Sequence, residues 1–109
     1  KDWLMIKVYV KKNNIVITGH AGFNDYGKDI VCASASSIVI TSINACLNID
    51  AKSIVYKNEL DKLTIDIKSD NSVILRILDN MLNMLSDLAN DYPKNVKIIK
   101  EEKLWILWS

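Results

Sequence analysis

Residues 19–36 constrain this chain more than any other part of its sequence. The segment contains the only histidine and one of the two cysteines, and it joins a β-branched run at 15–18 to a mostly apolar run at 30–47 without glycine or proline. β-Branched residues favour strands, whereas a long run without breakers favours a helix. We therefore expect a strand that ends at His20, a loop, and a helix that begins just before Cys32.

Two side chains of this segment can form a catalytic pair. Asp29 is a good N-cap residue, which would place Cys32 at about the third position of the helix. Helix N-termini favour anions, and cysteines there or beside histidine commonly have a lowered thiol pKa. If His20 folds back over the helix start, His20 and Cys32 become general base and nucleophile of a cysteine hydrolase. The alternative is a small buried Cys32 and a surface His20 at a turn.

The second cysteine occupies a different part of the same predicted helix. With about 100° per residue, Cys32, Ser36 and Cys46 lie along one face. We expect Cys32 at the solvent end of this face and Cys46 deeper in the core, where it packs without reacting. Only Cys32 would then combine access with the helix dipole.

The same residues resemble a known family. Over residues 19–36, the pattern G-H-A-G-F-x-x-Y-G-x-D-I-V-C-A-x-x-S is similar to the signature of the ribosomal-processing cysteine protease family, Prp, and the similarity extends from about residue 5 to residue 102. The resemblance implies that Cys32 is the nucleophile and His20 the general base. It also implies the substrate, an N-terminal extension of large-subunit ribosomal protein twenty-seven, which these endopeptidases remove in bacteria that make the protein as a precursor.

Five further residues of the segment are candidates for supporting the site or binding the substrate: Gly22, Tyr26, Gly27, Asp29 and Ser36. The first three belong to a loop that we expect to close over an extended peptide. Asp29 and Ser36 match positions of the family pattern, although N-capping explains Asp29 equally well, and a bond to its own helix carbonyl explains Ser36. Two other functions stay open: a non-enzymatic ribosome-assembly module that binds a peptide, and a thiol-dependent enzyme acting on another substrate such as a thioester.

Length and composition limit the remaining classes. At 109 residues, 50% hydrophobic and 25% charged, the chain fits one globular domain, expected over 5–103. A net charge of +1 lacks the basic excess of nucleic-acid-binding proteins, so we expect no direct contact with nucleic acid. One histidine and two cysteines do not make a four-ligand zinc site without carboxylates, so we expect no metal and no other cofactor.

The ends of the chain and its location are also open to prediction. Two cysteines without a signal-peptide pattern suit a reducing compartment, which predicts a cytoplasmic location. We expect no apolar run long enough to cross a membrane. Residues 1–4 are an appended remnant or a frayed native end, and 104–109 a vector-encoded tail, an added edge strand or a partner-binding segment.

The periodicity of the whole chain predicts a two-layer α+β fold, with a largely antiparallel sheet that carries two helices in the order β-β-α-β-β-α-β. The expected strands are 6–10, 15–18, 53–56, 63–67 and 96–99, and the expected helices are 30–47 and 73–90. The helix at 73–90 has more apolar surface than one sheet contact needs. Either two elements of the same chain pack on it or a second subunit does, and we expect a homodimer.

Overall fold

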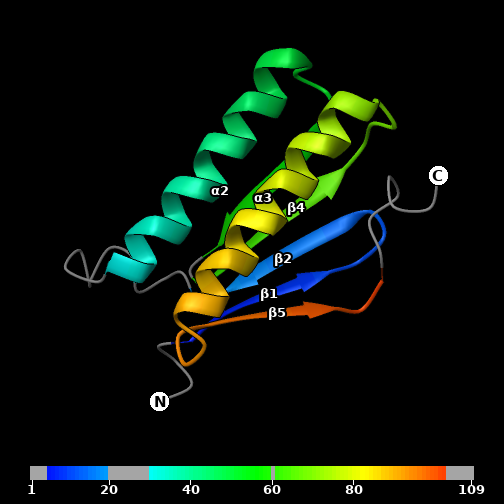
Figure 1. Cartoon of the computed structure of the whole chain (residues 1–109). Helices are drawn as coiled ribbons and strands as arrows, with labels where there is room; N and C mark the ends of the chain where they lie inside the picture. The colour runs from blue at the N-terminus through cyan, green and yellow to red at the C-terminus, as the bar shows by residue number, and fades with distance from the viewer. Residues whose placement is uncertain (1–4, 20–29, 60, 103–109) are drawn as a thin grey trace.

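The computed structural model describes residues 5–19, 30–59 and 61–102, and the expectations for the two chain ends lie outside these ranges. The described residues form a two-layer α+β fold, in which a five-stranded sheet carries two helices on one face (Figure 1). The elements are β1 (Ile6–Val10), β2 (Asn14–Thr18), α2 (Ile30–Ile49), β3 (Ile54–Glu59), β4 (Lys62–Ile67), α3 (Ser72–Asp91) and β5 (Val96–Lys100). Both the predicted fold class and the predicted order β-β-α-β-β-α-β are confirmed.

The strands lie in the order β3-β4-β2-β1-β5. The pairs β1–β2 and β3–β4 are antiparallel hairpins, and β2–β4 is antiparallel although α2 and β3 lie between these two strands in the chain. The pair β1–β5 is parallel, because the chain returns to the sheet through α3 before it forms β5. Among the described strands, β3 and β5 are the edges of the sheet.

The hydrophobic core lies between the sheet and the two helices. In β1 and β2, alternate residues are buried, which is the period-two pattern that the sequence predicts. The buried residues of α3 are Ile74, Leu75, Leu78, Met81, Leu82 and Leu85. Because α3 packs against both α2 and β5, the same chain covers most of its apolar surface. The apolar excess of this helix therefore no longer requires a second subunit, and the homodimer stays a prediction.

Strand β3 is longer than predicted. The polar residues after Tyr56 indicated a turn, but Lys57, Asn58 and Glu59 continue the antiparallel pairing with β4. Polar side chains are tolerated there because β3 is an edge strand and these three residues are exposed. The connection from β3 to β4 is correspondingly shorter than the sequence indicated.

The expectation that no apolar run could cross a membrane was wrong for α2. Among the described residues, α2 is the one helix that is long and apolar enough to cross a membrane, with 20 residues and a mean hydropathy of 1.8. This criterion considers only length and composition. Its buried apolar residues belong to the core, and it packs against α3 and β3. Core helices of globular proteins also meet this criterion, so the finding is weak evidence for a membrane.

Gly19 directly follows β2 and has a backbone φ of 86°. Its N–H donates a hydrogen bond to the carbonyl oxygen of Asp61, 3.2 Å away, which ties the end of β2 to the start of β4. A Cβ at this position would collide with the carbonyl oxygen of Met5 and lie 3.3 Å from the Cα of Ile6. Both the backbone conformation and the close approach of the Met5 backbone therefore require glycine.

We expect Gly19→Ala to lower the free energy of unfolding by about 1–3 kcal/mol, because it adds a side chain where φ is positive and space is absent. Urea unfolding at 25 °C measures the loss. Gly19→Asn separates the two causes, since asparagine tolerates positive φ better than alanine but meets the same Met5 carbonyl. A similar loss in both variants indicates that the close approach dominates. An unchanged midpoint for Gly19→Ala would contradict the structure.

Candidate active site

Cys32 is the third residue of α2, as the sequence predicts. The N-terminal end of a helix is the positive end of the helix dipole, and its backbone N–H groups point toward this end. The first turn of α2 contains no acidic residue that would oppose a negative sulfur. The position of Cys32 on its helix is therefore one that favours a thiolate.

The exposure of Cys32 differs from the prediction. Its side chain is only 5% exposed and belongs to the hydrophobic core, together with Val31 and Ala35. The expectation that Cys32 lies at a solvent-exposed end of the helix was therefore wrong.

Cys46 is buried and structural, as predicted. Its side chain is 0% exposed, and burial raises the pKa of its thiol. Its carbonyl oxygen accepts hydrogen bonds from the Ser53 hydroxyl at 3.1 Å and from the Asp50 N–H at 3.0 Å. Cys46 thus lies where α2 ends and the chain turns toward β3, and little of its thiol is ionised near neutral pH.

The other predicted residues of the loop lie outside the described part of the chain: His20, Gly22, Tyr26, Gly27 and Asp29. The pairing of His20 with Cys32, the N-cap role of Asp29 and the closure of the loop therefore stay predictions. Within residues 5–19, 30–59 and 61–102, no group of three or more His, Cys, Asp or Glu side chains is placed to hold a metal ion.

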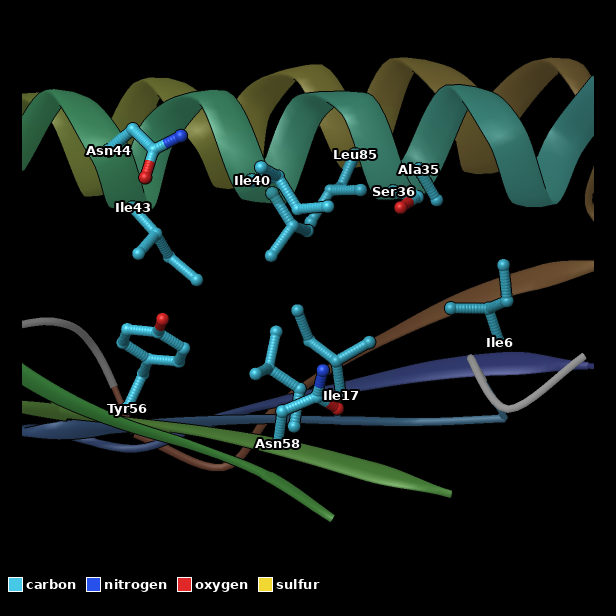
Figure 2. Close-up of a pocket in the computed structure, with 12 residues that line it drawn as sticks. Ile6, Ile17, Ala35, Ser36, Ile40, Ile43, Asn44, Tyr56, Asn58 and Leu85 are labelled. Carbon is cyan, nitrogen blue, oxygen red and sulfur yellow. The ribbon is translucent and has the colours of Figure 1, made fainter. Parts of the chain in front are cut away.

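Ser36 is half-buried and lines a cavity between α2 and the sheet, one helical turn after Cys32 (Figure 2). The cavity has a volume of about 120 Å³. Tyr56 and Asn58 of β3 also line it, and the sequence did not single out either residue. Tyr56 and Asn58 are two residues apart in β3, so both lie on the helix side of the sheet. The sequence could have indicated this only if it had also indicated that β3 continues to Glu59. The Ser42 hydroxyl donates a hydrogen bond to the backbone carbonyl oxygen of Ile38, 2.8 Å away. This is the kind of bond within the helix that the sequence analysis considered for Ser36.

A protein-family model and known protein sequences are similar to this chain over most of its length. The family model for the cysteine protease Prp matches residues 5–97. The ribosomal processing cysteine protease Prp of Staphylococcus aureus strain Mu50 is 30% identical over 91 residues, which cover 81% of this chain and 86% of the relative. The protein of the same name from Mycoplasma genitalium is 32% identical over 109 residues, which cover 90% of this chain and 97% of the relative.

Solved structures share the fold. The crystal structure of Prp from S. aureus in complex with a substrate peptide has a TM-score of 0.73 at 23% identity, and covers 89% of this chain and 98% of that chain. The same protein with a covalently linked product peptide has a TM-score of 0.75 at 24% identity, with the same coverage. The sequence matches carry the assignment beyond the fold: this chain belongs to the ribosomal processing cysteine protease Prp family.

Proposed function

We propose that this protein is a cysteine endopeptidase that removes the N-terminal extension of large-subunit ribosomal protein twenty-seven during bacterial ribosome maturation. The observation that carries the proposal is Cys32 in the first turn of α2, at the cysteine of the family pattern. The S. aureus relative has been crystallised with a substrate peptide and with a covalently linked product peptide, which supports the same class of ligand for this chain.

In the proposed mechanism, His20 accepts the proton of the Cys32 thiol, and the thiolate attacks the carbonyl carbon of the peptide bond. Backbone N–H groups of residues 31–33 are candidates to stabilise the oxyanion, because backbone N–H groups point toward the positive N-terminal end of a helix, where a developing negative charge is favoured. His20 then donates its proton to the leaving amine, and a thioester remains on Cys32. Water, deprotonated by His20, hydrolyses the thioester and restores the thiol.

The burial of Cys32 adds a step to this mechanism. Because the side chain is 5% exposed without substrate, peptide binding has to displace the groups that cover the sulfur before attack is possible. Closed sites that open or rearrange around a substrate are common in enzymes that must exclude water. We include such a rearrangement in the proposal.

A non-enzymatic peptide-binding module for ribosome assembly is the second candidate, and the burial of Cys32 is the observation that favours it. In that case the thiol would be a small hydrophobic core residue. Both candidates bind a peptide, and we propose a cytoplasmic location for either one, where ribosomes assemble and thiols stay reduced.

Cleavage of a peptide that spans the precursor's processing site tests the nucleophile directly. We expect Cys32→Ala to reduce the cleavage rate about 10³-fold or more, because it removes the attacking atom, and His20→Ala to reduce it about 10²–10⁴-fold. Cys46→Ala is the matched control and should leave the rate within about twofold, since Cys46 lies outside the site. Mass spectrometry of the products measures the rate. Cleavage that survives Cys32→Ala would overturn the assignment, and binding without cleavage by the unmodified protein would favour the second candidate.

The two cysteines should also differ in their reaction with iodoacetamide. We expect Cys32 to react at pH 7 when the groups that cover it move, and to react faster once a peptide is bound, whereas Cys46 should react only after unfolding in guanidinium, because burial raises the pKa of its thiol and blocks access. Burial raises the pKa of the Cys46 thiol in the folded state above its pKa in the unfolded state. The neutral buried thiol therefore stabilises the fold fully at pH values below the unfolded-state pKa. This stabilisation is lost as the pH rises through the folded-state pKa. Peptide mapping by mass spectrometry identifies the modified residue, and equally slow labelling of both cysteines would argue against an activated thiolate.

A further inference from the structure

The two helices cover one face of the sheet (Figure 1), and we call the opposite face the open sheet face. Its side chains alternate with the core-facing ones along each strand, and all of them are half-buried or exposed. Strand pairing aligns ten of these side chains in two rows that run from β3 to β5. The lysine row consists of Glu59, Lys62, Thr18, Lys7 and Lys97, and the tyrosine row consists of Lys57, Thr64, Val16, Tyr9 and Ile99.

Charge is distributed unequally between the two layers of the fold. The five strands contain five lysines but only two acidic residues, Glu59 and Asp66. Helix α2 contains no charged residue, and α3 contains Arg76 and three aspartates. The net charge of +1, from which we expected no contact with nucleic acid, therefore sums a basic sheet and an acidic helix layer.

We propose that the open sheet face binds single-stranded RNA, with phosphate groups on the lysine row and bases on the tyrosine row. This inference goes beyond the proposed function and requires neither Cys32 nor His20. It replaces the expectation of no direct contact with nucleic acid, which rested on the net charge alone. Three properties of the face support it: its lysine pair, its aromatic surface and the spacing of its two rows.

The lysine pair consists of Lys7 and Lys97, which lie directly opposite each other on the neighbouring strands β1 and β5. Like charges in this position repel, so the pair does not contribute to the stability of the sheet. The partner of Lys7 on its other side is the uncharged Thr18, and the acidic residue of the row, Glu59, is paired with Lys62. A phosphate group above Lys7 and Lys97 would offset their repulsion, because both ammonium groups can donate to it.

The aromatic surface is centred on Tyr9. In the tyrosine row it lies between Val16 and Ile99, and the three side chains are half-buried, so each exposes part of its apolar surface. Bases of single-stranded RNA stack on aromatic side chains exposed on sheets, and this stacking tolerates different sequences. Thr64, the next residue of the row, has a hydroxyl group that can hydrogen-bond to the 2′-hydroxyl that RNA has and DNA lacks.

The spacing of the two rows suits one strand of nucleic acid. The rows are two residues apart along the strands, which separates them by about 7 Å, and neighbouring strands lie about 4.8 Å apart. From Lys62 to Lys97 the lysine row crosses four strands, a span of about 14 Å. An RNA strand that lies across the sheet can therefore place its backbone along one row and its bases over the other.

Fluorescence anisotropy with a labelled, mixed-sequence single-stranded RNA of about twelve nucleotides tests the lysine row. Lys7→Gln combined with Lys97→Gln should weaken binding about tenfold or more at about 0.1 M salt. It should also reduce the slope of log affinity against log salt by about 1.4, because two phosphate contacts are lost. Lys52→Gln combined with Lys94→Gln is the matched control: both lysines are exposed and lie in turns outside the open sheet face, so affinity should stay within about twofold.

Substitutions of Tyr9 test the aromatic surface. Tyr9→Leu should weaken RNA binding about tenfold, because it removes the ring on which a base stacks, whereas Tyr9→Phe should keep the affinity within about twofold. Urea unfolding of each variant shows whether the fold is intact. The variant with both Lys7→Gln and Lys97→Gln should unfold at the same or a higher urea concentration, because the repulsion between the two lysines is gone.

RNA affinity that stays within twofold after the two lysine substitutions would overturn the inference. Competition by polyglutamate as strong as that by unlabelled RNA would also overturn it, because the face would then recognise an acidic peptide. If the unmodified protein binds no RNA and the lysine substitutions convert a dimer into a monomer in sedimentation, a second copy of the chain covers this face. RNA binding that depends on Lys7 and Tyr9 in a protein that cleaves no precursor peptide would support this inference and count against the proposed function alone.

Discussion

The packing of α2 against the sheet and beside α3 determines where Cys32 and Ser36 lie. Its buried residues Val31, Ala35, Val39 and Ile43 follow the spacing of one helical face, and they fix the rotation of the helix about its axis. Cys32 is adjacent to this face, so the same packing that stabilises the fold also sets the direction of the proposed nucleophile. A change in the core beneath α2 would therefore alter the site as well as the stability.

The two cysteines of α2 are both buried but lie at opposite ends of the helix. Both are at most 5% exposed, but Cys32 lies in the first turn and Cys46 in the last. The positive end of the helix favours an anion at Cys32, whereas desolvation and the negative end both oppose one at Cys46. In the proposed mechanism, substrate binding has to change only the access to Cys32, because its favourable electrostatic position is already built into the helix.

The helix layer leaves the inner face of strand β3 partly exposed, and the order of the strands explains why. α3 packs on α2 and reaches toward β5, so the β3 edge at the other end of the sheet is covered by α2 alone. Inward-facing residues of β3 beyond Ile54 therefore stay exposed, Tyr56 among them, and the cavity forms where Ile40 and Tyr56 approach without filling the space. A polar edge strand and an incompletely covered helix face are then two consequences of one arrangement.

The sequence by itself determined the element order, the buried faces of β1 and β2, and Cys32 at the third position of a helix, because periodicity and capping are local properties. It also contained the family pattern on which the roles of His20 and Cys32 are proposed. Only the tertiary structure decided the parallel pairing of β5 with β1, the length of β3, the 5% exposure of Cys32 and the cavity beside Ser36. These features depend on contacts between residues far apart in the chain, which local patterns do not specify.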